Sequence, residues 1–385
     1  MRICSPHCGV DPETTSGGET YEREVLRHLG ALGHSIEILL ARRKRFPEDV
    51  PNWTIHRLPI GRGLRWPVAA LLLPPYIKRL YARPGFDLLR VHSLRFIGPA
   101  AIIARRRYRL DVPIVAHHHH LDPSWLNPVI EARVMRAVER VVVGSEFATR
   151  QAAAVLGVPR EKFAVVPYGV DRRFRPGPRP ESLAARWGLD GGVVGLFLGG
   201  LKSRKNLFFL IDAWREVTAA RPDARLVIAG SGPLLEPLRR YAAGRGQARE
   251  VVFTGYVPER EKVAYYNLAD VLLFPSSMEG FGLTVAEAMS CALPVVASNR
   301  GSLPELVMDG EGGFLVEPSD RDTFVRKTLL LCGDPMLRRK FGTANVERVD
   351  RLFRWDHCAA TTARIYEEVL REWREGHAAA RGGRA

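Results

Sequence analysis

The features that this chain lacks exclude several classes of protein. No apolar run approaches the ~20 residues that a membrane-spanning helix needs, and the longest candidate, Val68 to Leu73, ends at two prolines. No charged N-terminal stretch precedes a long apolar one, so we expect no secretory signal. The five cysteines are scattered without a C-x-x-C pair. This pattern favours reduced thiols in a cytoplasmic protein over a disulfide framework.

Length and charge narrow the remaining classes. The 385 residues exceed one ordinary hydrophobic core, which predicts two domains. The formal net charge is +15, and residues 1–170 hold +10 of it, from 25 Lys and Arg against 15 Asp and Glu. Such an excess favours anionic partners, namely lipid headgroups, phosphorylated acceptors or nucleic acid. A solvated, arginine-rich surface is the competing explanation.

Two series of short apolar runs, separated by helical patterns, predict an α/β protein with two doubly wound parallel sheets. In the first series, the strand candidates are 35–40, 88–92, 113–116 and 140–144, and the helix candidates are 20–32 and 129–138. In the second series, the strand candidates are 193–198, 226–229, 251–253, 271–274 and 294–297. Each sheet should be covered by helices on both faces.

The domain boundaries follow from composition. The stretch Arg172 to Pro180 reads RRFRPGPRP, which can form neither a helix nor a central strand. We therefore expect an N-terminal domain over 1–171, a linker over 172–190 that can act as a hinge, and a C-terminal domain over 191–355. A long helical pattern over 356–373 ends the chain, and the small, basic tail from Gly376 is expected to be disordered.

One segment of the first domain has two interpretations. Residues 61–80 read GRGLRWPVAALLLPPYIKRL, an aromatic and a short apolar block with flanking Arg and Lys. Such a segment can lie at a membrane interface. A buried helix with basic ends is the alternative.

The most informative stretch is 279–287, which reads EGFGLTVAE. It follows an apolar run and precedes a helical pattern, so it reads as strand, glycine turn and helix. A helix that opens on a glycine turn presents unpaired backbone N–H groups and a positive dipole end, which suit a phosphate. The carboxylates of Glu279 and Glu287 accept hydrogen bonds and so suit vicinal hydroxyls. The combination indicates a sugar nucleotide.

A run of four histidines follows the expected strand at 113–116, at the carboxyl end where open α/β sheets bind ligands. A metal site is disfavoured, because consecutive residues of an extended chain point to opposite faces. A solvated structural run is a second interpretation. The third is that one imidazole contacts a sugar hydroxyl or the acceptor.

Two glycine loops complete the set of motifs. Gly17 and Gly18 follow the first strand, and Gly199 and Gly200 follow the first strand of the second series, with Lys205 shortly after them. Glycines at these positions allow tight turns and the close approach of an anion to the backbone. Each loop alone is a weak signal, since most glycine turns only connect elements.

Taken together and in this order, the motifs resemble the retaining glycosyltransferases of family 4, which have the GT-B fold of two Rossmann-like domains facing a central cleft. The E-x7-E spacing of Glu279 and Glu287 carries the resemblance, and it extends over nearly the whole chain. Further matching segments are Val141–Ser145, Val165–Asp171, Gly230–Pro233, Phe253–Val257, Gly301–Glu305 and Gly312–Val316.

The resemblance implies roles for individual residues. Catalytic roles fall on His119, Glu279 and Lys205, with His118 or His120 as the alternative to His119. The implied donor-binding residues are Gly17, Gly18, Gly200, Arg204, Lys205, Val257, Glu279, Gly280, Phe281, Gly282, Leu283, Thr284 and Glu287. Gly200 stands where the family usually has an arginine, so Arg204 or Lys202 would have to supply that charge.

The implied reaction is transfer of a sugar from a nucleotide-diphosphate sugar, with retention at the anomeric carbon. The cleft would close over the donor, and no metal or other cofactor is expected; Asp320-Arg321-Asp322 reads as a helix N-cap and not as a Mg²⁺ site. The first domain would bind a lipid-linked, glycan or other anionic acceptor. This predicts a cytoplasmic protein with peripheral contact to the inner membrane face and no nucleic-acid partner.

Three rival hypotheses remain at this point. A non-enzymatic basic nucleic-acid-binding protein would explain the net charge, but not two series of strands with glycine turns at their ends. A GT-B enzyme of another reaction type, such as a nucleotide-sugar epimerase or a phosphorylase, would keep the fold. A donor-binding protein without turnover is suggested by Gly200 alone.

Overall fold

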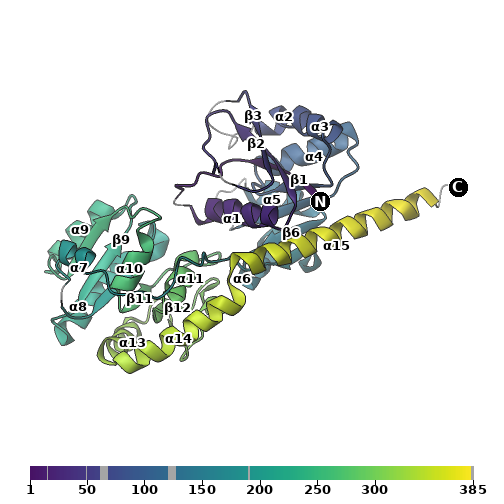
Figure 1. Cartoon of the computed structure of the whole chain (residues 1–385). Coiled ribbons are helices and arrows are strands. Elements are labelled where there is room, and N and C mark those ends of the chain that lie inside the picture. Colours follow the sequence, from purple (N-terminus) through teal and green to yellow (C-terminus); the bar gives the residue numbers. More distant parts are fainter. Residues whose placement is uncertain (15, 49, 61–67, 120–126, 190, 383–385) are drawn as a thin grey trace. The chain divides into compact units, whose positions relative to one another are not determined.

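The computed structural model describes residues 1–14, 16–48, 50–60, 68–119, 127–189 and 191–382, which form two compact units (Figure 1). Unit 1 comprises Met1–Gly169 together with Trp355–Ala385, and unit 2 comprises Val170–Arg354. The chain therefore passes from one unit to the other twice, and the second passage returns the C-terminal helix to unit 1.

Unit 1 is built on a seven-stranded, all-parallel sheet in the order β3-β2-β1-β4-β5-β6-β7. Its strands are β1 (Arg2–His7), β2 (Ser35–Ala41), β3 (Trp53–Leu58), β4 (Leu88–Val91), β5 (Ile114–His118), β6 (Arg140–Val143) and β7 (Phe163–Val165). Its helices are α1 (Gly17–Ala31), α2 (Ala69–Leu72), α3 (Pro74–Ala82), α4 (Ile97–Tyr108), α5 (Asn127–Ala137), α6 (Glu146–Leu156), the 3-10 turn η1 (Arg160–Lys162) and α15 (Trp355–Gly382).

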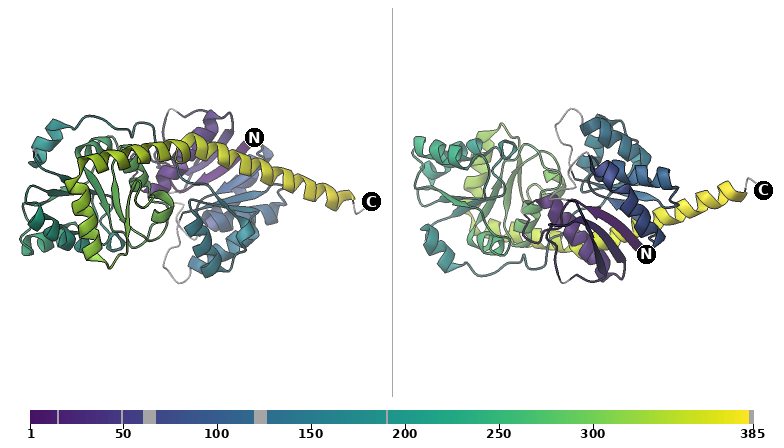
Figure 2. Two further views of the ribbon diagram at one scale, coloured as in Figure 1. Left: turned by 90° about the horizontal axis from the view of Figure 1, so that it is seen from below. Right: turned by 90° about the horizontal axis from the view of Figure 1, so that it is seen from above.

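The central strands β1, β4 and β5 are buried along almost their whole length, and this burial includes polar side chains such as His7, Arg90 and His117. α1 and α15 pack side by side, and α4 contacts α2, α3 and α5 (Figure 2). Because parallel crossovers are right-handed, α1 and α4 leave the sheet in opposite directions and cover opposite faces. The strand order reverses between β1 and β4, and this switch point places the loops after them at one edge of the sheet.

Unit 2 repeats the plan with a six-stranded parallel sheet in the order β10-β9-β8-β11-β12-β13. Its strands are β8 (Val194–Leu198), β9 (Arg225–Ala229), β10 (Val251–Gly255), β11 (Val271–Phe274), β12 (Val295–Ser298) and β13 (Gly313–Val316). Its helices are α7 (Glu181–Trp187), η2 (Ser203–Lys205), α8 (Leu207–Ala220), α9 (Leu235–Gly244), α10 (Lys262–Leu268), α11 (Leu283–Ser290), α12 (Leu303–Leu306), α13 (Arg321–Gly333) and α14 (Pro335–Leu352).

The structure confirms the expected α/β class with two doubly wound parallel sheets and corrects three details. The second series has a sixth strand, β13, which the apolar pattern missed because it is short and begins with glycine. The expected linker over 172–190 belongs to unit 2: it contains α7, and Phe174 is buried against Tyr266. The residues from Gly376 to Gly382, expected to be disordered, continue α15.

The apolar segment of the first domain falls partly outside the described residues, which omit 61–67. Its described remainder forms α2 and α3, and Leu71 there is 73% exposed. Among the described helices, none has the length and apolarity to cross a membrane.

Candidate active site

Glu279 lies at the centre of a buried polar cluster at the carboxyl end of β11. Its Oε1 atom accepts hydrogen bonds from Lys205 Nζ at 2.5 Å, from Arg204 at 2.6 Å and from Ser276 Oγ at 2.6 Å. Lys205 comes from η2, after β8, so the neighbouring strands β8 and β11 bring the two charges together. Lys205 also lies over the Phe274 ring, 4.5 Å from its centroid. The sequence did not single out Ser276, although its hydroxyl completes the cluster.

The charged groups of this cluster change one another's pKa values. Burial alone would raise the pKa of Glu279, but Lys205 and Arg204 outweigh it and hold that pKa below its usual value. Burial lowers the pKa of Lys205, with Glu279 opposing the change and Arg204 adding to it. Glu279 is therefore a carboxylate with two cations on one oxygen, so an arriving anion would meet two positive groups already in place.

The backbone at Glu279 leads into a helix N-terminus. Gly282 caps α11 at a φ of +96°, a conformation that favours glycine. Among the described residues, none accepts a hydrogen bond from the amides of Leu283 and Thr284, the first two residues of α11. Behind the turn, Gly301 approaches so closely that an added Cβ would lie 2.5 Å from the Glu279 carbonyl oxygen.

Glu287, one helix turn further along α11, belongs to a second cluster. Its Oε2 atom accepts a hydrogen bond from the Tyr266 hydroxyl at 2.7 Å and lies 3.5 Å from Lys262 Nζ, and Lys262 also pairs with Glu259 at 2.7 Å. Burial raises the pKa of Glu287, against the charge of Lys262. Its Oε1 atom has no hydrogen-bond partner among the described residues. The sequence reasoning missed Tyr266 and Lys262, which hold this carboxylate from α10.

The glycine loops after β8 and β9 pack against each other. An added Cβ at Gly230 would lie 1.9 Å from the Gly199 carbonyl oxygen, so only glycine fits. Gly200, by contrast, has open space where a Cβ would be. Arg204, which reaches Glu279, supplies the second cation of this site. Val257 is buried in the loop that follows β10.

His119, the histidine expected to face a substrate, lies in unit 1 just after β5. Its Nε2 atom is 2.9 Å from Glu22 Oε1, and its Nδ1 atom hydrogen-bonds to the Tyr168 hydroxyl. Gly18, in the first turn of α1, lies beside the ring: an added Cβ would be 3.4 Å from His119 Cδ2. Both ring nitrogens therefore have protein partners, and a contact of either with a ligand requires an exchange of hydrogen bonds.

The other members of the histidine run differ in role. His117 is buried. Its Nδ1 atom lies 3.0 Å from the Tyr21 hydroxyl oxygen, and its Nε2 atom lies 2.6 Å from the Tyr366 hydroxyl oxygen. His118 ends β5 and is buried, and His120 lies outside the described residues. His117 and His119 share one side of the strand, as period-two alternation requires.

Glu22, on α1, organises unit 1 in a way that the sequence did not reveal. Its Oε2 atom accepts a hydrogen bond from Arg90 and lies 3.6 Å from His7 Nε2. Burial would raise the pKa of Glu22, but Arg90, together with His92 and the hydrogen bond from His119, outweighs it and holds that pKa well below its usual range. Its ligand atom also lies within 4.8 Å of those of His7 and His92, which is close enough for a metal. Arg90, however, already donates to this oxygen and balances its charge.

In sum, the structure brings Arg204, Lys205 and Glu279 together in unit 2, at the loop that leads into α11, and places Glu287 one turn along that helix. It places His119, Gly17 and Gly18 together in unit 1. Asp320 caps α13 by accepting from the Thr323 amide, which confirms the N-cap interpretation of that acidic pair.

Two Rossmann-like units, the second with cations and a helix N-terminus around a buried glutamate, define a glycosyltransferase of the GT-B fold. The fold is that of the sucrose-phosphate synthase of Thermosynechococcus elongatus, which it matches with a TM-score of 0.80 at 22% identity, over 97% of this chain and 100% of that one. The family models named Glycosyltransferase Family 4 and Glycosyl transferases group 1 match residues 15–174 and 185–348. The chain belongs to family 4 of the glycosyltransferases.

Two glycosyltransferases of named activity are similar to this chain in sequence. A GDP-mannose-dependent alpha-(1-6)-phosphatidylinositol monomannoside mannosyltransferase of Mycolicibacterium smegmatis is 32% identical, over 74% of this chain and 78% of its own length. A D-inositol 3-phosphate glycosyltransferase of Acidothermus cellulolyticus is 35% identical, over 96% of this chain and 88% of its own length. Both the nucleic-acid-binding and the epimerase hypotheses are thereby set aside.

Proposed function

We propose that this glycosyltransferase moves a sugar from a nucleotide-diphosphate donor bound by unit 2, with retention at the anomeric carbon, to an acceptor that carries a phosphate. The observation that supports the donor site best is the cluster of Lys205 and Arg204 on Glu279, beside the free amides of α11. Cations and amides of this kind stabilise the charge that develops on a departing diphosphate.

Each residue of the donor site has a proposed role. Lys205, Arg204 and the amides of Leu283 and Thr284 bind the diphosphate, and the carboxylate of Glu279 fixes hydroxyls of the donor sugar. The free Oε1 atom of Glu287 accepts hydrogen bonds from the ribose hydroxyls, while Tyr266 holds its other oxygen. The two cations supply the positive charge that a metal ion would otherwise give, so we propose a reaction without a metal cofactor.

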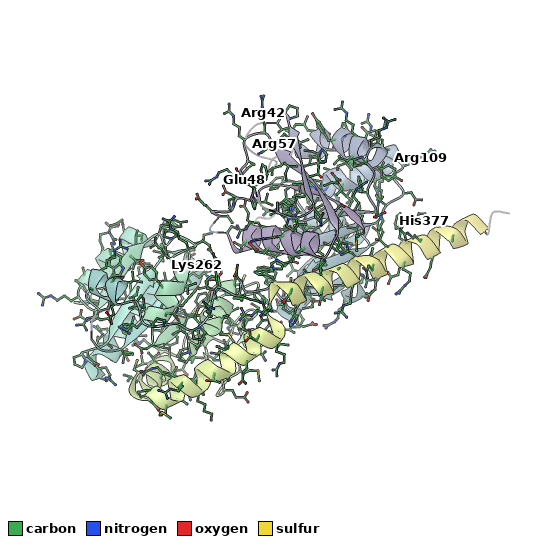
Figure 3. All side chains as sticks on the ribbon, in the orientation of Figure 1. Arg42, Glu48, Arg57, Arg109, Lys262 and His377 are labelled. Carbon is green, nitrogen blue, oxygen red and sulfur yellow. The ribbon has the colours of Figure 1, made fainter. Side chains whose placement is uncertain are left out.

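The acceptor proposal is supported by the charge of unit 1 and by the names of the relatives. Both named relatives act on compounds of phosphorylated inositol, one of them a lipid. Figure 3 shows Arg42 and Arg57 near β2 and β3, and Arg109 apart from them at the end of α4, so arginines lie in more than one region of this unit. The exposed Leu71 on α2 adds an apolar group to this unit. We infer peripheral contact of unit 1 with anionic lipid at the cytoplasmic membrane face.

The donor site is tested by thermal shift with GDP-, UDP- and ADP-sugars. A ligand at ~100 times its Kd stabilises the folded protein by about 2.7 kcal/mol. We expect a rise in Tm with one nucleotide, and loss of that rise in Lys205→Met and Glu287→Gln. Lys202→Met, at an exposed neighbouring lysine, is the matched control and should keep the rise. No rise with any nucleotide sugar would overturn the donor site.

The acceptor and the stereochemistry are tested together by transfer of labelled sugar. With the nucleotide sugar that gives the thermal shift, transfer to phosphatidylinositol or inositol phosphate is expected, whereas the unphosphorylated alcohols should not react. The anomeric configuration of the product, measured by NMR, should equal that of the donor. Inversion would refute retention, and equal transfer to phosphorylated and unphosphorylated acceptors would refute the phosphate requirement.

A further inference from the structure

The hydrogen bonds of His119 define where its protons are. Nε2 lies 2.9 Å from Glu22 Oε1, and Nδ1 is paired with the Tyr168 hydroxyl. The ring is only 17% exposed, and Glu22 is 2% exposed, so water does not compete strongly for either bond. A buried pair of this kind fixes the side chain in one orientation.

Glu22 can only accept in this arrangement. Arg90, together with His92 and the hydrogen bond from His119, holds the pKa of Glu22 well below its usual range in spite of burial, so the side chain is a carboxylate and has no proton to donate. The hydrogen bond to Oε1 must therefore come from Nε2–H of His119. The negative charge of Glu22 therefore decides that the proton of this hydrogen bond is on Nε2.

The charge of Glu22 is already balanced. Arg90 is fully buried; it donates to Glu22 Oε2 and also to the Tyr366 hydroxyl of α15 at 3.0 Å. With this guanidinium on Oε2, the Oε1 atom is left to accept from Nε2–H of His119. The Nδ1 atom then carries a lone pair. Burial raises the pKa of Tyr168 well above its usual value, so the phenol keeps its proton and donates it to Nδ1.

We propose that Glu22 is a positioning residue, which keeps the proton of the His119 ring on Nε2, so that Nδ1 serves as a hydrogen-bond acceptor. A substrate hydroxyl takes the place of the Tyr168 hydroxyl on Nδ1, and Glu22 prevents the ring from turning or changing tautomer during that exchange. This inference rests on the proposed function, because it needs a substrate hydroxyl at His119.

The decisive variant is Glu22→Gln, because it keeps the shape and reverses the hydrogen bond. The amide oxygen should accept from Arg90, which leaves the amide N–H₂ group to donate to His119 Nε2. His119 must then carry its proton on Nδ1 and donate it to the Tyr168 oxygen. Tyr366→Phe is the matched control: it also destabilises the buried cluster of unit 1, by removing the hydroxyl that contacts Arg90 and His117, but it keeps both Arg90 and the carboxylate of Glu22.

Two measurements separate positioning from a loss of stability. Nitrogen chemical shifts of ¹⁵N-histidine-labelled full-length protein report the tautomer, with the His119 signals identified by their absence in His119→Gln. We expect Nε2–H in the wild type and in Tyr366→Phe, and Nδ1–H in Glu22→Gln. We also expect kcat to fall about tenfold in Glu22→Gln, as for one lost hydrogen bond, with nucleotide binding unchanged and a much smaller fall in Tyr366→Phe.

The outcomes that would overturn the inference are distinct from those for the proposed function. Nδ1–H in the wild type, an unchanged tautomer in Glu22→Gln, or equal losses of kcat in the two variants would each refute positioning by Glu22. Absence of transfer by the wild type with every donor would instead refute the proposed function, and the tautomer measurement does not depend on it.

Discussion

Acid should destabilise unit 1 through its buried histidines, and His7 allows the size of the effect to be worked out. His7 is fully buried at the end of β1, stacks on His92 with ring centroids 4.0 Å apart, and lies 3.6 Å from Glu22. Burial, with Arg90 adding to it and Glu22 opposing it, lowers the pKa of His7 from 6.5 to about 4. The folded state therefore keeps this histidine neutral where the unfolded chain protonates it.

The sign of the effect follows from proton binding. Between pH 6.5 and about pH 4 the unfolded chain binds the extra proton, so the free energy of unfolding falls as the pH falls through this window. At ~1.36 kcal/mol per pH unit, the burial of neutral His7 lowers the free energy of unfolding by about 2 kcal/mol at about pH 5, relative to neutral pH. Burial also lowers the pKa of His92 and of His117, so these two histidines act in the same direction.

The thiols of this chain allow unit 1 to be followed by itself. The five cysteines are buried and form no disulfide; Cys4, Cys8 and Cys358 lie in unit 1, and Cys291 and Cys332 lie in unit 2. Urea unfolding at about pH 8 and about pH 5, with pulsed labelling by a thiol reagent that reacts in acid, gives the free energy of each unit by mass spectrometry.

The variant His7→Asn removes the titrating group and keeps an N–H donor for the Gly9 carbonyl oxygen, which His7 Nδ1 contacts at 3.2 Å. Its unit 1 should lose about 2 kcal/mol less than the wild type between the two pH values. Equal losses in the two proteins would show that His7 is not held neutral by burial, and the reasoning would be wrong.

Two further predictions concern stability: the first tests the close packing at Gly169, and the second tests a helix cap. An added Cβ at Gly169 would lie 2.4 Å from the backbone of Trp355, so Gly169→Ala should destabilise unit 1 by about 1–3 kcal/mol in thiol-labelled urea unfolding. Gly376→Ala, on α15 with open space around it, should leave unit 1 unchanged or slightly more stable; similar losses in the two variants would contradict the steric argument. The Asp334 carboxylate accepts from the Leu337 amide at 2.9 Å and caps α14, so Asp334→Ala should cost unit 2 about 1 kcal/mol, and an unchanged urea midpoint would show that the cap contributes little.

The sequence predicted those parts of the fold that depend on local patterns. Buried parallel strands read as apolar runs because both faces are covered, and glycine turns mark where strands give way to helices. The stretch 279–287 is the clearest case, since strand end, turn and helix start are contiguous. The missed strand β13 and the helical end of α15 lie where the apolar pattern is short or the composition is small and basic.

The choice among the histidines shows where local reasoning stops. Alternation along β5 places His117 and His119 on one side, but it does not say what lies opposite them. The structure shows that α1 supplies Tyr21 to one and Glu22 to the other. In the sequence Glu22 is one of several charged residues in a helix pattern, with no sign that it is buried.

What the sequence determined by itself was the alternation of strands and helices, the glycine turns and the spacing of Glu279 and Glu287 across the start of a helix, because those depend on residues within a few positions of each other. Tertiary structure alone decided that Glu22 meets Arg90, 68 residues away, and that Tyr366 joins Arg90 from 276 residues away. These contacts exist because the strand order brings β1, β4 and β5 side by side and α15 returns to pack on α1. A buried charge such as Glu22 needs a partner of opposite charge, and here that partner, Arg90, is too distant in the sequence for a local pattern to identify.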